Sequence, residues 1–250
     1  MTMTQEQMES LPLDLVDKLR LVPTATASYA LQKLGIRRPA MRGVYPLAPM
    51  GVGNRAVGRA ITVRYLPVRE DLQESMMKAG RWAYAVRQAM QMLGPSDVLV
   101  IDAMGLGAQD GGVMGDIMGA YINYRGAAAV VTDGAVRDSP FLSKMGLRIF
   151  CKGVHADDGA YLHADMNVMV QCGGILVVPG DVILGDDEGV IVIPRSMAAK
   201  VADVASERDD LELFIRNRIE QGVPLPEIYP PTEAVLQEYR RSRGASSKHR

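Results

Sequence analysis

The chain has 250 residues, enough for one large domain or two small ones with a substantial buried core. With 28 basic and 29 acidic side chains, its net charge of −1 gives no overall attraction for nucleic acid or an anionic membrane. No apolar run approaches membrane-spanning length, and the first residues lack the pattern of a secretory signal. The two cysteines, Cys151 and Cys172, form no CxxC motif, so we expect reduced thiols in a cytoplasmic protein.

The first hundred residues alternate helical and extended patterns. Apolar spacing and β-branched runs predict helices at 11–21, 24–34 and 81–93, and strands at 59–66 and 97–103. Residues 36–54 and 105–115 are rich in glycine or proline and are expected to be mainly loops. Residues 67–82 are polar and form an excursion before the third helix.

The stretch from Gly111 to Gly153 organises the rest of the chain. A glycine-rich loop ends at Gly115, and Asp116 opens an apolar-periodic helix that Gly126 closes. Residues 127–132 form a continuous apolar run, which predicts a strand covered on both faces. This strand leads into a charged turn, a short helix and another strand.

The last hundred residues combine short strands with one long helix. Residues 154–169 are acidic and are expected to be irregular. Strands are predicted at 175–178, 182–184 and 190–193, with the GDDEG segment as a tight turn, followed by a helix to about residue 221. Helices and strands that alternate early and strands that cluster late indicate a layered α/β domain with a mixed sheet.

The charged turn contains Arg137 and Asp138, at the carboxyl end of a predicted strand. Ligand-binding groups of α/β sheets gather at such strand ends, close to helix N-termini. The first turn of the helix at Asp116 offers free N–H groups to an anion. Either feature alone is explained by helix capping or a surface ion pair. Together, at one end of the sheet, they predict a site for an anionic ligand.

Three segments carry a family resemblance: GDIM (115–118), TDGAVRD (132–138) and VQCGGILVVPGDVILGDDEGVIVIP (170–194). With twenty residues between Asp116 and Arg137, they resemble the RraA-like family. That family includes class II 4-hydroxy-4-methyl-2-oxoglutarate/4-carboxy-4-hydroxy-2-oxoadipate aldolases and the regulator of ribonuclease activity A. The resemblance covers roughly 24–222. It leaves 1–23 as an N-terminal segment with a short helix and 223–250 as a partly disordered C-terminal extension.

The resemblance implies a fold and an assembly. The expected fold is an α/β, layered β/β/α swivelling-type sandwich with a mixed sheet, flanked by N-terminal helices and a long C-terminal helix. The expected assembly is a homotrimer or a dimer of trimers.

The resemblance also implies a site. Asp138 would hold a divalent metal cation, Mg²⁺ or Mn²⁺, and Arg137 would contact substrate oxygens. The backbone N–H groups of Gly115, Asp116, Ile117 and Met118 would receive the substrate carboxylate, and the Asp116 side chain would orient metal-bound water. Glu212 is the nearest match to an acidic residue that reaches the site from a neighbouring subunit. A solvated helix face explains Glu212 equally well.

The function implied is a metal-dependent lyase that cleaves a 4-hydroxy-2-oxo acid to pyruvate and decarboxylates oxaloacetate. One alternative is a non-enzymatic regulator that binds an endoribonuclease, and another is a lyase or dehydratase of sugar-acid catabolism. Many aldolases of the family carry an acidic residue two or three positions after the Arg-Asp pair, where this chain has Pro140 and Phe141. This departure and the insert at 67–82 leave the far half of the substrate open.

A second metal cluster is conceivable from two histidines and three aspartates, His155, His163, Asp157, Asp158 and Asp165. Their spacing matches no metal-binding motif, so a solvated loop with polar contacts is favoured.

Overall fold

The computed structural model describes residues 9–81 and 83–246. The chain divides into two compact units, one ending at Ala202 and the other beginning at Asp203. None of the helices in the described ranges combines the length and apolar character needed to cross a bilayer.

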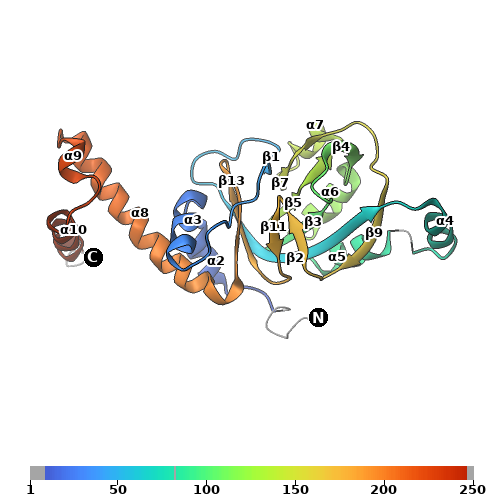
Figure 1. The fold of residues 1–250 in the computed structure, drawn as a ribbon, viewed down its shortest axis with the longest axis horizontal. Coiled ribbons are helices and arrows are strands. Elements are labelled where there is room, and N and C mark those ends of the chain that lie inside the picture. Colours follow the sequence, from blue (N-terminus) through green and yellow to red (C-terminus); the bar gives the residue numbers. More distant parts are fainter. Residues whose placement is uncertain (1–8, 82, 247–250) are drawn as a thin grey trace. The chain divides into compact units, whose positions relative to one another are not determined.

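An eight-stranded mixed sheet forms the core of the first unit (Figure 1). Its strands are β1 (Tyr45–Pro46), β2 (Ala56–Pro67), β3 (Asp97–Asp102), β5 (Ala129–Thr132), β7 (Arg148–Cys151), β9 (Tyr161–Met166), β12 (Val182–Asp186) and β13 (Gly189–Ile193). The order is β1-β7-β5-β3-β2-β12-β13, and β9 also pairs with β2. Strands β2, β3, β5 and β7 are parallel, whereas β1, β9, β12 and β13 are antiparallel to their partners.

Both faces of the central strands are buried. On β3, Leu99 and Ile101 join one apolar cluster, whereas Val98 and Val100 join another, as the two-residue repeat of a strand requires. The helices of this unit are α2 (Leu13–Arg20), α3 (Thr24–Lys33), α4 (Glu70–Lys78), α5 (Tyr84–Met92), α6 (Asp116–Tyr124) and α7 (Ser139–Leu142). Helices α5, α6 and α7 contribute to the first cluster, and the hairpin of β10 (Val170–Cys172) and β11 (Ile175–Val177) contributes to the second. The layered α/β class predicted from the sequence is therefore confirmed.

A smaller parallel sheet supports the candidate site. It consists of β4 (Gly107–Gly112), β6 (Gly134–Val136) and β8 (Gly153–Val154), in the order β4-β6-β8. Strand β6 follows β5 directly, so the chain leaves the main sheet and enters this second sheet before it reaches Arg137. The second sheet therefore determines where the Arg-Asp pair lies.

Two segments expected to be loop or irregular contain strands. Residues 107–112, within the predicted glycine-rich loop, form β4 through backbone pairing with β6, a contact that depends on no side-chain pattern. Residues 161–166, within the predicted irregular segment, form β9 on β2, about a hundred positions earlier in the chain. In both segments, long-range pairing prevails over a weak local preference.

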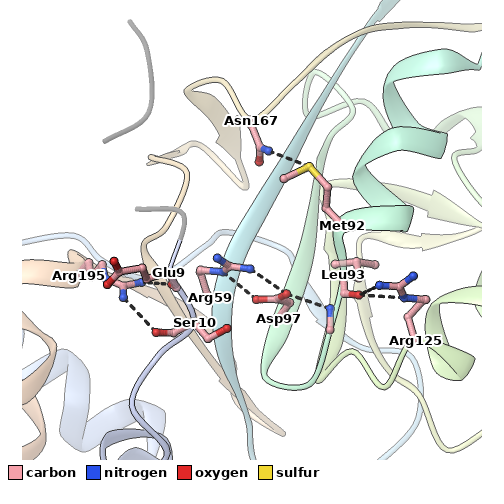
Figure 2. Close-up of polar contacts among 10 residues, drawn as sticks. Glu9, Ser10, Arg59, Met92, Leu93, Asp97, Arg125, Asn167 and Arg195 are labelled. Carbon is pink, nitrogen blue, oxygen red and sulfur yellow. Dashed lines mark hydrogen bonds and ion pairs between the residues drawn. The ribbon is translucent and has the colours of Figure 1, made fainter. Parts of the chain in front are cut away.

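A buried ion pair joins the amino ends of β2 and β3 (Figure 2). Arg59 donates from Nε and Nη2 to the two carboxylate oxygens of Asp97, at 2.8 and 3.0 Å. The same carboxylate accepts the N–H of Gly94 at 3.0 Å, so it also closes the turn between α5 and β3. Next to this turn, Arg125 at the end of α6 donates from Nε and Nη2 to the carbonyl oxygen of Leu93 (Figure 2).

The second unit is helical. It contains most of α8 (Ala198–Glu220), with α9 (Leu225–Ile228) and α10 (Glu233–Ser246). Its apolar core consists of Leu211, Ile215, Ile228, Val235 and Tyr239. Helix α8 crosses the point at which the two units divide. The predicted segmentation at 1–23, 24–222 and 223–250 stays a prediction, and residues 1–8 and 247–250 lie outside the described residues.

Candidate active site

The site begins at the N-terminus of α6, which starts at Asp116 as predicted, with Gly115 as its N-cap residue. The first hydrogen bond within the helix runs from the N–H of Gly119 to the carbonyl of Gly115 at 3.0 Å. The N–H groups of Ile117 and Met118 lie in the first turn, where a helix provides no preceding carbonyl. These amides, at the positive end of the helix dipole, suit an anion.

Asp138 and Arg137 meet this helix start. The Asp138 carboxylate accepts the N–H of Asp116 through Oδ2 at 3.3 Å, and the same oxygen lies 3.5 Å from Arg137 Nε. Both side chains are 38% exposed, so the pair stands at the surface of the site. Asp138 adopts a left-handed conformation with φ of 55°, at the N-cap of α7. The strained turn and the backbone contact to α6 together fix where its carboxylate points.

The close approach depends on the absence of a side chain at position 115. A Cβ atom on Gly115 would lie 2.5 Å from Asp138 Oδ2 and 3.1 Å from Arg137 Nε. A Cβ atom does not approach another group to 2.5 Å, so any side chain at position 115 would displace the Asp138 carboxylate. The glycine therefore allows the helix start and the Arg-Asp pair to touch.

Asp158 also contacts Arg137; the sequence placed it in a solvated loop with polar contacts and gave it no role at this site. Its Oδ1 lies 2.6 Å from Arg137 Nη1. Backbone hydrogen bonds bring it there: the Gly112 N–H donates to the Asp157 carbonyl at 2.9 Å, and the Gly159 N–H donates to the Gly112 carbonyl at 3.0 Å. The guanidinium of Arg137 thus lies between two carboxylates. Only the pairing of residues 112 and 158 reveals this contact, and local sequence carries no signal for it.

A cavity of about 380 Å³ opens beside these groups. Its lining includes residues 112–118, Arg137, residues 158–161, His163 and one residue of α4, Gln73. Asp138 does not line it, but touches Asp116 and Arg137, which do. The predicted substrate-binding residues therefore share one cavity, and the predicted metal ligand contacts two of them. Their roles stay predictions.

The Asp138 carboxylate is suited to a hard cation. Oδ2 accepts the Asp116 N–H, whereas Oδ1 has no hydrogen-bond partner among the described residues. A partly exposed carboxylate with a free oxygen fits Mg²⁺ or Mn²⁺, which keep several waters and bind through one or two protein carboxylates. Among the side chains that the structure describes, which leave out those of 108–110 and 244–246, there is no group of three or more His, Cys, Asp or Glu that could hold a metal by themselves.

Two other sets of predicted residues lie elsewhere. Glu212 lies on α8 in the second unit and accepts a hydrogen bond from Arg208 Nε at 2.6 Å. Its role at a neighbouring subunit's site stays a prediction. His163 and Asp165, expected in a solvated loop, lie on β9 instead. The His163 ring stacks on the fully buried Tyr65, with 4.3 Å between ring centroids.

Two buried carboxylates at strand ends of the main sheet, Asp102 and Asp133, stabilise the fold. Asp102 ends β3 and Asp133 follows β5, and Gln171 Nε2 donates to both, at 2.6 and 2.8 Å. Asp133 also accepts the Ala103 N–H at 2.8 Å. Burial raises the pKa of the Asp133 carboxyl and of the neighbouring Cys172 thiol. These buried groups tie the hairpin β10–β11 to the main sheet.

Comparisons with known proteins agree with this fold. The model of the RraA-like family, described as Aldolase/RraA, matches residues 14–192, and the chain belongs to this family. A protein of Halalkalibacterium halodurans named "Putative 4-hydroxy-4-methyl-2-oxoglutarate aldolase" is 30% identical over 203 residues, which cover 80% of this chain and 86% of the relative.

Two solved structures resemble the chain closely. RraAS2 of Streptomyces coelicolor, described as an unusual member of the RNase ES inhibitor RraA protein family, is 33% identical with a TM-score of 0.71, over 82% of this chain and 98% of that one. An uncharacterized protein of Pseudomonas syringae pv. tomato is 26% identical with a TM-score of 0.73, over 88% and 94%.

Proposed function

We propose that the protein is a divalent-metal-dependent lyase that cleaves a 4-hydroxy-2-oxo acid to pyruvate by retro-aldol chemistry and also decarboxylates oxaloacetate. One observation carries the proposal: Arg137 and Asp138 meet the N-terminus of α6, and Arg137 and this helix start line a cavity. A cation site, a guanidinium and free amides are the groups that a 2-oxo acid needs for binding. The relative named for this aldolase activity supports the substrate class.

The substrate's carboxylate is received by the N–H groups of Gly115, Ile117 and Met118. The N–H of Asp116 is not available, because it donates to Asp138. Arg137 donates to the 2-oxo oxygen, where a planar fork stabilises developing negative charge. Its ion pairs with Asp138 and Asp158 orient the guanidinium before substrate arrives.

Asp138 is the residue that would hold Mg²⁺ or Mn²⁺. Such a cation acts as a Lewis acid for the electron pair that the reaction leaves on the three-carbon product.

The bond changes are those of a retro-aldol reaction. The 4-hydroxyl proton passes to a water that the Asp116 carboxylate orients, and C4 becomes a carbonyl carbon as the C3–C4 bond breaks. The electron pair of that bond forms the enolate of pyruvate, and protonation at C3 completes the product. For oxaloacetate, loss of CO₂ leaves the same enolate. Arg137 therefore serves both reactions, whereas Asp116 is needed for the first.

The proposal includes the assembly, a homotrimer or a dimer of trimers in the cytoplasm. In this assembly, Glu212 of each chain faces the site of a neighbouring subunit and adds an acid–base group there. Sedimentation measurements on the wild type, with Glu212→Gln assayed for turnover in parallel, test both parts.

Pyruvate release tests the activity directly. The purified protein is incubated with 4-hydroxy-4-methyl-2-oxoglutarate or oxaloacetate, with EDTA or with added Mg²⁺ or Mn²⁺. We expect turnover that EDTA abolishes and either metal restores, and that Arg137→Ala removes. Asp14→Asn, an exposed change in the first turn of α2, serves as a control that retains turnover. Absence of metal-dependent pyruvate release from every 2-oxo acid tried would overturn the proposal.

A second candidate function follows from the likeness to RraAS2, whose description names inhibition of RNase ES. In that case, the protein would dock on an endoribonuclease and need no cavity chemistry. Inhibition of a purified RNase E-type enzyme by wild type and Arg137→Ala alike, without any lyase turnover, would favour it. The third possibility is a lyase or dehydratase of sugar-acid catabolism. Turnover of sugar-derived 2-oxo acids, without turnover of 4-hydroxy-4-methyl-2-oxoglutarate, would distinguish it from the proposed aldolase.

A further inference from the structure

A second cavity, separate from the candidate active site, opens beside the hairpin of β10 and β11. Its volume is about 550 Å³, within the range of about 300–1,000 Å³ that small-molecule sites occupy. None of its lining residues lines the cavity at Arg137. The proposed lyase reaction therefore uses no residue of this second cavity.

Most of the lining of this second cavity is apolar. Apart from one glycine, two arginines and one aspartate, the lining residues are prolines and aliphatic residues, among them Ile36, Ile175, Val178 and Val192. Leu176 of β11 also lines the cavity and is 61% exposed. A ligand with an apolar body would remove this surface from water, which is favourable.

The two arginines of the lining, Arg38 and Arg42, come from one segment that precedes β1. Backbone hydrogen bonds hold this segment in place. The Val192 N–H donates to the Pro39 carbonyl at 3.0 Å, and the Arg42 N–H donates to the Gly173 carbonyl at 2.9 Å. The segment therefore runs between β13 and the turn of the hairpin, and it brings both guanidinium groups to the apolar cavity.

Both guanidinium groups have N–H groups available to a ligand. Arg42 donates from Nη2 to the carbonyl of Gly174 at 3.2 Å, which fixes its position and leaves its other N–H groups without a partner among the described residues. Gly174 has φ of 72°, and a Cβ atom there would overlap this guanidinium, so the turn requires glycine. Arg38 forms no hydrogen bond or ion pair with any described residue.

The one acid of the lining, Asp181, does not neutralise the arginines. It is buried, its Oδ2 accepts the Val178 N–H at 2.9 Å, and it forms no ion pair with a described residue. Burial raises the pKa of Asp181 to about 6, so the carboxyl is largely ionised at neutral pH. Two positive charges and one negative charge leave an excess of one positive charge, which suits a ligand with a single carboxylate.

We infer that this cavity is a second binding site, for a small acid with one carboxylate and an apolar body. Arg38 and Arg42 receive the carboxylate, and the aliphatic side chains around Leu176 cover the apolar body. The site is independent of the proposed function, because it shares no lining residue with the other cavity and its ligand needs neither a 2-oxo group nor a metal.

NMR of isoleucine methyl groups locates the bound acid. Ile36 and Ile175 line the second cavity and Ile117 lines the candidate active site, so their signals report on the two cavities separately. The probes are hexanoate, hexan-1-ol, which lacks the charge, and acetate, which lacks the chain. Dissociation constants are obtained from the shifts for wild type, Arg38→Ala and Arg37→Ala. Arg37 is exposed and does not line the cavity, so it controls for the lost charge.

We expect hexanoate to shift the Ile36 and Ile175 signals and to bind at least fivefold more tightly than hexan-1-ol or acetate. Arg38→Ala should weaken hexanoate binding by at least fivefold, and Arg37→Ala by less than twofold. Hexanoate shifts confined to Ile117, equal weakening in the two variants, equally tight binding of hexan-1-ol, or no shift at Ile36 and Ile175 overturns the inference. Pyruvate with Mg²⁺ should shift Ile117 alone, and failure of that shift would count against the proposed function only.

Discussion

One added methyl group at Gly115 tests whether the position of the Asp138 carboxylate matters for activity. In Gly115→Ala, the new Cβ would lie 2.5 Å from Asp138 Oδ2, whereas ordinary contact begins at 3.4 Å. The carboxylate must therefore move by about 0.9 Å, and Arg137 Nε, at 3.1 Å, by a few tenths of an ångström. The backbone at Gly115, with φ of −128° and ψ of −165°, is one that alanine adopts, so the fold is not strained. The change acts on the site alone.

A displacement of about 1 Å in a positioned catalytic group lowers rates by about 10²-fold. We therefore expect kcat/KM for pyruvate release to fall by about 10²-fold in Gly115→Ala, with little change in the thermal midpoint. Gly94→Ala is the matched control. A Cβ there has no neighbour closer than 3.8 Å, and the residue lies at the amino end of β3, away from the site. Activity of Gly115→Ala within twofold of wild type would refute this description of the site.

Three further changes have predictable effects. Asp97→Asn leaves the buried Arg59 without its carboxylate and should lower the free energy of unfolding by about 3–5 kcal/mol in urea titrations. Burial raises the pKa of Asp181 to about 6 from an ordinary value of 3.8, so folding stability falls as pH rises through this window. Asp181→Asn should remove that fall, about 3 kcal/mol between pH 3.5 and 7. Asp158→Asn breaks an exposed ion pair of Arg137, worth about 0–1 kcal/mol, and should raise KM by no more than about fivefold.

For each of these three substitutions, one result would contradict the expected effect. A loss below about 1 kcal/mol in Asp97→Asn would mean that the guanidinium finds another partner. Parallel pH profiles of stability for wild type and Asp181→Asn would mean that this carboxyl titrates normally in the folded protein. A change in kcat without a change in KM for Asp158→Asn would assign that residue to the chemical step instead of to the orientation of Arg137.

Sequence patterns predicted the elements whose side chains carry strong local signals. The apolar runs at 97–103 and 127–132 became β3 and β5, because a strand covered on both faces needs apolar residues at successive positions. Helix α6 begins and ends near Gly115 and Gly126, as the capping residues indicate. The GDDEG segment is the turn between β12 and β13. Local chemistry determined each of these.

The elements that the patterns missed are held by distant partners. Strand β4 has three glycines among six residues, so nothing in its composition favours a strand, and only backbone pairing with β6 makes it one. Strand β9 is half polar and depends on β2. Both strands line the cavity of the candidate active site, through Gly112 of β4 and through Tyr161 and His163 of β9, so this part of the lining could not be assigned from the sequence. The part of the lining formed by 115–118 and Arg137 was predictable, and the rest of the lining was not.

Metal binding by Asp138 is the central claim, and titration of Mn²⁺ into metal-free protein with saturating pyruvate tests it most directly. The wild type and Asp14→Asn should bind one ion per chain, and Asp138→Asn, which keeps the size of the side chain, should bind at least about tenfold more weakly. If Asp138→Asn binds Mn²⁺ as tightly as the wild type, the cation site lies elsewhere and the proposed site is wrong.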